Sequence, residues 1–209
     1  MPARSGTPCG VENWDQAGWD RTQALLLRSA VAGASFAVPH MKRRGGGSII
    51  NTASVSALQA GYAPLAYSVA KAGVLHFTRV AAAELSAHRI RINAILPGFI
   101  GTHIFGQSLG LGQDESKQMA EAIAARSAGV NPIGRPGLPR DIAEAALYFA
   151  SDAAGFVTGT HLTVDGGLTI GPRHAWDPET PGPLARTLGL TREKIAALRA
   201  AKSGGASGQ

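Results

Sequence analysis

The stretch INTASVSALQAGYAPLAYSVAK, residues 50–71, decides how the rest of this sequence is interpreted. It starts inside a largely apolar run, residues 48–52, which predicts a short strand of the buried parallel kind. After a turn it continues into residues 64–88, where apolar side chains recur at helical spacing and predict a long helix. A strand followed by a helix of this length is typical of the units that build a parallel sheet.

Three side chains in this stretch predict a proton-transfer site. Tyr67 and Lys71 are four residues apart, so they share one face of the predicted helix. A free phenol has a pKa near 10, and a neighbouring ammonium lowers it toward the range of a useful acid or base. Ser54 follows the strand, at the edge where parallel sheets hold their sites. Taken alone, the Tyr-x-x-x-Lys spacing fits an exposed tyrosine beside a solvating lysine equally well.

The remaining pattern predicts an α/β fold, with a parallel sheet of about three strands and helices outside it. The other expected elements are helices over residues 14–42, 114–127 and 139–151, and strands over residues 91–96 and from residue 161. We expect a domain over residues 1–170. A Pro-rich and Gly-rich extension, residues 171–209, should be partly disordered.

Length, composition and charge limit the domain number, the location and the partners that we expect. The chain has 209 residues, 44% of them hydrophobic, which fits one globular domain. A single cysteine, Cys9, and no apolar secretory leader predict a cytoplasmic protein, and no apolar run reaches the length of a membrane span. The net charge of +6 is scattered, which argues against nucleic acid as a partner. The six histidines show no ligand spacing, so we expect no metal.

Several segments together resemble the short-chain dehydrogenase/reductase family. They are GGSIINTAS before the helix, the serine thirteen residues before Tyr67, RINAILPGFIGT after the helix, and the later NPIGRPGLPRDIAEAALYFASD and FVTGTHLTVDGG. The resemblance covers about residues 19–170. It implies a doubly wound, Rossmann-like fold. It also implies that the protein binds NAD or NADP and interconverts alcohols and ketones by hydride transfer.

The resemblance also implies roles for individual residues. Ser54 would orient the substrate oxygen, Tyr67 would donate and accept the proton, and Lys71 would lower the pKa of Tyr67. The implied cofactor-binding residues are Tyr67, Lys71, Pro97, Gly98, Ile100 and Thr102. For Thr102, a turn hydroxyl bonded to its own backbone is the alternative.

The sequence departs from the family pattern at two places. No Gly-x-x-x-Gly-x-Gly turn follows a strand, and residues 1–13 are too short to supply a βαβ unit of about 30 residues. Leu26 stands where the family usually carries an asparagine that completes a water-linked proton relay. The chain therefore resembles a truncated copy: a fragment, a degenerate product or a subunit completed by another chain.

Two hypotheses follow from these observations. The first is an NAD(P)-dependent oxidoreductase acting on a small alcohol or ketone, with Ser54, Tyr67 and Lys71 at its site. The second is an inactive truncated homologue or partner subunit that acts through helix association. The resemblance also implies a homo-oligomer through the two long helices. The alanines of residues 66–83 permit such close approach, although ordinary core packing explains them too.

Overall fold

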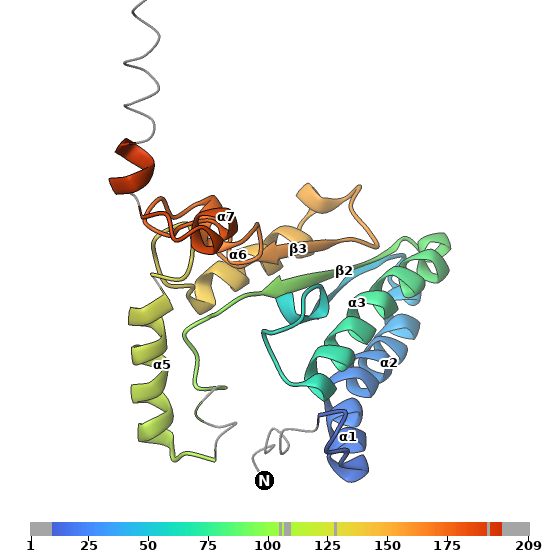
Figure 1. The fold of residues 1–209 in the computed structure, drawn as a ribbon. Helices are drawn as coiled ribbons and strands as arrows, with labels where there is room; N and C mark the ends of the chain where they lie inside the picture. Colours follow the sequence, from blue (N-terminus) through green and yellow to red (C-terminus); the bar gives the residue numbers. More distant parts are fainter. Residues whose placement is uncertain (1–9, 105, 107–109, 128, 192, 198–209) are drawn as a thin grey trace, which may run out of the picture. The chain divides into compact units, whose positions relative to one another are not determined.

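The computed structural model describes residues 10–104, 106, 110–127, 129–191 and 193–197 (Figure 1). The chain divides into two compact units, Met1–Thr169 and Ile170–Gln209, which are described separately. The disorder expected at the very end of the extension falls outside the described residues.

A parallel sheet forms the centre of the first unit. Its described strands are β1 (Gly47–Thr52), β2 (Ile90–Pro97) and β3 (His161–Val164), in the order β1-β2-β3. Their register pairs Ile49 with Ile92 and Leu96 with Thr163. The α/β class and the three predicted strands are confirmed.

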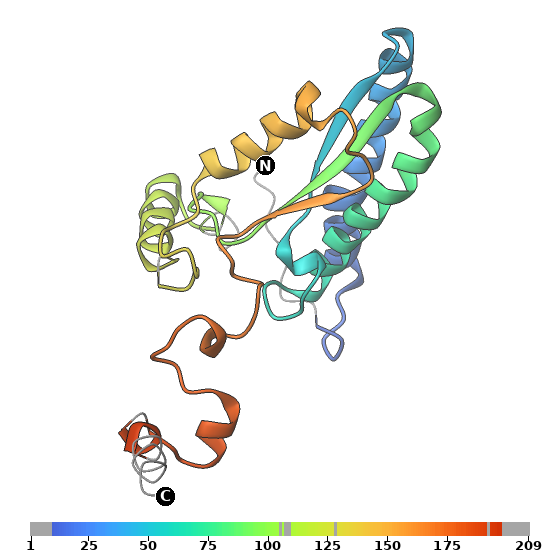
Figure 2. The ribbon, with the colours of Figure 1, turned by 90° about the horizontal axis from the view of Figure 1, so that it is seen from above.

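Helices cover both faces of this sheet (Figure 2). α2 (Ser29–Arg43) and α3 (Leu65–Leu85) lie on one face, and α6 (Pro139–Ala150) lies on the other.

Alternate residues of β2 supply the two halves of the core. Ile92 and Leu96 pack toward α3, whereas Ile95 packs with Phe149 of α6. Full burial of each such side chain contributes about 1.5–3 kcal/mol relative to exposure. The apolar residues Ile92, Ile95 and Leu96 account for the strand predicted over residues 91–96.

The structure describes further elements besides these layers. In the first unit they are α1 (Gln16–Gln23), η1 (Ala24–Arg28), η2 (Val55–Ala57), η3 (Ser86–His88), α5 (Gln113–Ser127) and η4 (Asp152–Ala154). The second unit contains η5 (Arg173–Ala175) and α7 (Pro183–Thr187). In that unit the Asp177 carboxylate accepts hydrogen bonds from Arg173 and Thr180 and from the backbone of Glu179.

The first long helix differs from its prediction in one respect. Residues 14–42 were expected to form a single α-helix, but a π-helical turn, η1, separates α1 from α2. A π-helical turn carries one extra residue, and such turns often occur at functional sites. Pro39 lies inside α2, which continues to Arg43.

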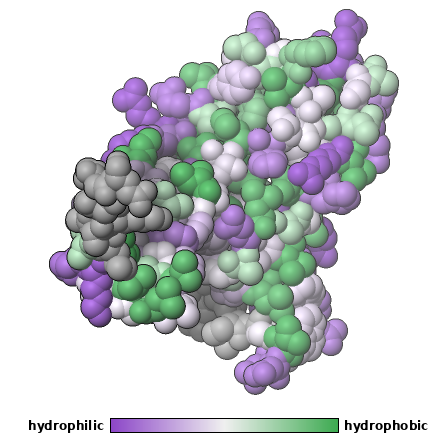
Figure 3. Space-filling model, turned by 45° about the horizontal axis from the view of Figure 1, so that its top comes forward, coloured by the Kyte–Doolittle hydropathy of each residue, from purple (hydrophilic) through white to green (hydrophobic). Residues whose placement is uncertain are grey.

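The stretch Gln16–Arg43 is also long and apolar enough to cross a membrane by length and composition alone, which the sequence interpretation had not anticipated. A single helix of this kind is weak evidence for a membrane span, because core helices of globular proteins pass the same test. Here little of the helix is buried, and Leu25, Val31 and Phe36 are exposed. Apolar and hydrophilic side chains are interspersed on the face of the molecule seen in Figure 3.

Candidate active site

Ser54 lies just beyond the carboxyl end of β1, where the chain turns into η2. Its extended backbone makes it the N-cap of that short helix, and its Oγ accepts a hydrogen bond from the backbone N–H of Ser56 at 3.2 Å. The hydroxyl of the buried Ser56 donates to the same Oγ at 3.0 Å. Two donors from one neighbour therefore fix the position of the Ser54 hydroxyl.

Tyr67 and Lys71 occupy the first two turns of α3 and lie close together, as the spacing predicts. The Lys71 ammonium is 5.6 Å from the centroid of the Tyr67 ring, within the range of a cation–π contact. Lys71 Nζ also donates to the backbone carbonyl of Thr52 at 2.7 Å. Tyr67 shares a hydrogen bond with the Ser54 hydroxyl. The structure thus brings together all three residues of the predicted proton-transfer site.

The electrostatics of this cluster differ from the sequence-based expectation. Burial raises the pKa of Tyr67 above its ordinary value, and the hydrogen bond with Ser54 opposes that shift without cancelling it. Burial also lowers the pKa of Lys71. The expected lowering of the Tyr67 pKa by Lys71 is therefore opposite to the direction found. Desolvation dominates, and the phenol stays in its neutral, proton-donating form.

The loop after β2 carries the residues predicted to face a nicotinamide. Pro97 ends β2, and the backbone of Gly98 donates to Val164 at 3.1 Å. A Cβ at Gly98 would lie 2.6 Å from the side chain of Asp165, so close packing alone requires glycine there. Ile100 is buried and forms a β-bridge with Gly137. These contacts fix the course of the loop.

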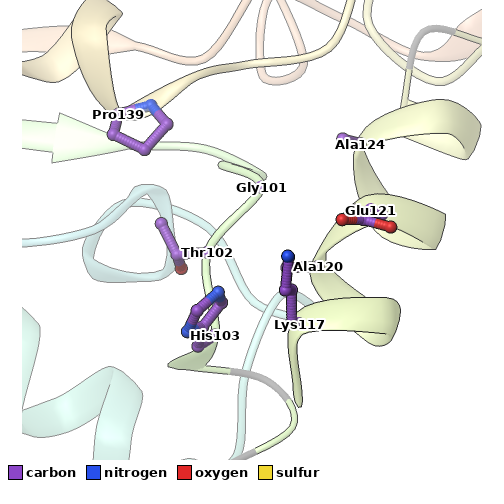
Figure 4. Close-up of a pocket in the computed structure, with 8 residues that line it drawn as sticks. All are labelled: Gly101, Thr102, His103, Lys117, Ala120, Glu121, Ala124 and Pro139. Carbon is purple, nitrogen blue, oxygen red and sulfur yellow. The ribbon is translucent and has the colours of Figure 1, made fainter. Parts of the chain in front are cut away.

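Thr102 is the member of this predicted set that lines a cavity (Figure 4). The cavity measures about 530 Å³ and lies between the loop and α5. Its described lining residues are Gly101, Thr102, His103, Lys117, Ala120, Glu121, Ala124 and Pro139. Most of this lining is apolar, with charged groups contributed by α5. Ser54, Tyr67 and Lys71 are not among the described lining residues.

Sequence reasoning missed two partners of the cluster, Ser56 and the carbonyl of Thr52. The Ser-x-Ser spacing of residues 54–56 is a signal for the first, because serine hydroxyls often bond to a backbone N–H two residues on. No side-chain pattern marks a backbone acceptor such as Thr52. Among the described residues, no group of three His, Cys, Asp or Glu side chains could hold a metal ion.

The residues present fit one end of a dinucleotide better than the other. A hydroxyl, a phenol and an ammonium at the end of β1, with Thr102 on the next loop, could hold a nicotinamide riboside. The Gly-x-x-x-Gly-x-Gly spacing occurs at residues 106–112, but these residues do not directly follow a strand, because β2 ends at Pro97. They therefore lack the strand-to-helix setting of a pyrophosphate turn. Leu26 lies in η1, so the asparagine expected in that part of the helix has no equivalent there.

Comparison with known proteins places this arrangement in a family. Residues 4–169 match the family described as enoyl-(acyl carrier protein) reductase. The chain belongs to the short-chain dehydrogenase/reductase family. A solved structure, that of levodione reductase, superposes with a TM-score of 0.67 at 30% identity, covering 80% of this chain and 64% of that one. This likeness confirms the Rossmann-like fold class.

Two relatives from Xanthobacter autotrophicus show how far the similarity extends. The chain is 39% identical to 2-(S)-hydroxypropyl-CoM dehydrogenase 3, over 76% of its own length and 60% of the relative's. It is also 39% identical to "inactive 2-(S)-hydroxypropyl-CoM dehydrogenase 2", over 72% of its own length and 64% of the relative's. The chain therefore spans less than two thirds of the length of these relatives.

Proposed function

We propose that this member of an oxidoreductase family interconverts a small alcohol and its ketone with NAD or NADP. The observation that carries the proposal is the convergence of Ser54, Tyr67 and Lys71 at the carboxyl end of β1. The names of relatives support the substrate class, since they include dehydrogenases of a hydroxypropyl compound and of cis-4-hydroxycyclohexanecarboxylate.

Each residue of the cluster has a defined task in this proposal. Ser54, held by Ser56, donates a hydrogen bond to the carbonyl oxygen of the substrate and orients it. Tyr67, a neutral phenol, gives the oxygen the proton that converts an alkoxide into an alcohol. Lys71 keeps a positive charge beside the ring and offsets the negative charge that develops on the phenol oxygen.

A nicotinamide cofactor, when bound, supplies or accepts the hydride. Tyr67 and Lys71 would hold its ribose hydroxyls, and the loop residues Pro97, Gly98, Ile100 and Thr102 would face its carboxamide. The rigid packing of Gly98 and Ile100 suits this task, because it fixes the loop before any ligand arrives.

Calorimetric titration of NADH and of NADPH into the purified 209-residue chain tests the proposal. Saturable binding at micromolar concentration is the expected result, and the tighter of the two identifies the cofactor. A folded chain that binds neither dinucleotide would contradict the proposal for this chain. Lys71→Met should weaken binding, whereas Lys42→Met, at an exposed residue of α2, is the matched control and should leave it unchanged.

A second candidate function is that of a non-catalytic subunit that associates through its helices. Exposed apolar side chains on η1, α2 and α3 support it, namely Leu25, Val31, Phe36, Val69 and Val80. One relative whose name includes "inactive" supports it as well. In both candidates we propose a homo-oligomer built on the helical face that carries these side chains.

A further inference from the structure

The start of α3, which carries Tyr67, is tied to a different helix. Gln23, the last residue of α1, donates its side-chain Nε2–H to the backbone carbonyl of Ala66 at 3.0 Å. Ala66 is buried and immediately precedes Tyr67. Pro64, the N-cap of α3, makes no side-chain hydrogen bond to the first turn. Pro64 therefore does not hold the first turn of α3 by a side-chain cap, and the Gln23 amide restrains that turn instead.

A second contact restrains α3 on the far side of Lys71. Leu27, in the π-helical turn η1, packs against Gly73. A Cβ on Gly73 would lie 2.8 Å from Leu27 Cδ2, so this close approach requires a glycine. The two contacts act one residue before Tyr67 and two residues after Lys71.

We propose that Gln23 is a positioning residue, which sets the orientation of Tyr67 toward Ser54 through its hydrogen bond to the Ala66 carbonyl. The inference rests on the proposed function of Tyr67 as the proton donor. Under this proposal, Gln23 restrains the proton-transfer site from the neighbouring helix. Leu26, three residues further on in η1, has no polar side-chain group that could do so.

The Gln23–Ala66 hydrogen bond acts on the turn of α3 that carries Tyr67. Tyr67 reaches Ser54 from the first turn of a helix, and a helix terminus frays more easily than its middle. The groups that face Tyr67 are Ser54 at the end of β1 and Lys71 on α3 itself. A shift of the first turn changes the Ser54 contact, whereas the Leu27–Gly73 contact still holds the turn that follows Lys71.

The test is a pH titration of the tyrosine rings of the full chain, labelled with carbon-13 and followed by NMR without cofactor. Tyr67 is assigned by the resonance that Tyr67→Phe removes. In Gln23→Met, which keeps the bulk and removes the donor, we expect a higher titration midpoint for Tyr67. The reason is that burial persists while the opposing hydrogen bond from Ser54 loosens. Gln16→Met, the same change at the exposed first residue of α1, is the control.

An unchanged or lower midpoint in Gln23→Met would overturn the proposal, and so would an equal rise in Gln16→Met. Circular dichroism of both variants checks that the helices remain. In a chain shown to bind cofactor, Gln23→Met should lower kcat roughly ten-fold and leave KM within about two-fold, because misplacement of a proton donor affects the chemical step. The titration does not require an active enzyme. A chain that lacks activity would therefore contradict the proposed function without deciding the role of Gln23.

Discussion

At the scale of single residues, the chemistry of the candidate site depends on burial more than on charge pairing. Tyr67 and Lys71 are both shifted toward their neutral forms, because each loses water on folding. A phenol that stays protonated is suited to give a proton to a ketone oxygen. In the proposed function, Tyr67 would give this proton to the ketone oxygen.

Replacement of Tyr67 tests its role directly. Tyr67→Phe should reduce turnover by about 10²–10⁴-fold, the usual contribution of a positioned acid or base. Cofactor affinity should fall by less than about ten-fold, the effect of one lost hydrogen bond to the ribose. Steady-state kinetics and calorimetry on the same preparations measure both quantities. Tyr148→Phe, a partly exposed tyrosine on α6, is the control and should retain full turnover. Undiminished turnover in Tyr67→Phe would exclude the proton role.

The pH dependence of the phenol follows from the direction of its shift. Because the pKa of Tyr67 is raised, its proton should be lost only above about pH 10, the ordinary value of a phenol. The difference in ultraviolet absorbance of tyrosinate between the unmodified chain and Tyr67→Phe isolates this titration. A midpoint below that of a free phenol would show that Lys71 outweighs burial.

At the scale of helices and strands, much of the structure could be predicted from periodicity. The apolar runs at β1 and β2 and the helical spacing in α3 were sufficient, because burial imposes those patterns directly. The π-helical turn η1 could not be predicted in this way, since a shift of one position within a five-residue turn is too short to change the apparent apolar period. The proximity of Tyr67 and Lys71 could be predicted because they are four residues apart on one helix. The place of Ser54 could be predicted because it follows the strand before that helix.

Other features of the site depend on contacts between segments that are distant in the sequence. The Gln23–Ala66 bond and the Ile100–Gly137 bridge have no local signature, so only the folded chain shows them. The direction of the Tyr67 pKa shift also needs the folded chain, because desolvation depends on everything that packs around the ring.

The start of α6 provides a stability prediction at this scale. Asp141 accepts two hydrogen bonds from Arg135, at 2.8 and 2.7 Å, and one from the backbone N–H of Leu138 at 2.8 Å. The pKa of Asp141 is lowered to about 2, first by the Arg135 hydrogen bond and then by that of Leu138. Asp141→Ala should cost about 1 kcal/mol of unfolding free energy at neutral pH.

The sign of the pH effect distinguishes this contribution from a general loss of stability. A carboxyl group with a lowered folded pKa stabilises the fold above its unfolded pKa, near 3.9. The difference between the unmodified chain and Asp141→Ala should therefore vanish as the pH falls from about 4 toward 2, as measured by urea unfolding. Glu144→Ala breaks the exposed pair with Arg140 and should change stability by less than about 0.5 kcal/mol. A pH-independent difference at Asp141 would contradict this account.

At the scale of the whole molecule, the exposed apolar side chains of α2 and α3 bear on whether the chain associates in solution. Phe36 on α2 has 78% of its surface exposed, and Val31, Val69 and Val80 are exposed as well. These exposed apolar side chains on α2 and α3 support the homo-oligomer proposed above. Gln16–Arg43, which includes Val31 and Phe36, also has the length and composition of a membrane-spanning helix.

Light scattering coupled to size-exclusion chromatography tests this association. Phe36→Glu should shift the chain toward the monomer, because a charge at the contact would have to be desolvated. Phe156→Glu is the control, since Phe156 is fully exposed but follows η4 and lies outside the two long helices. If only Phe156→Glu dissociated the oligomer, the association would run through another face.

The order of the strands has a consequence for the chain as it is synthesised. β2 pairs Ile90 with Gly47 on one edge and Ala94 with His161 on the other. Parallel pairing closes long loops before it gains contacts, so it is slow. Ile95 packs with residues of α6, which the ribosome adds much later than β2 itself. The nascent chain must therefore carry an uncovered apolar strand through about fifty further residues of synthesis, a few seconds at the usual rate, during which chaperones have access to it.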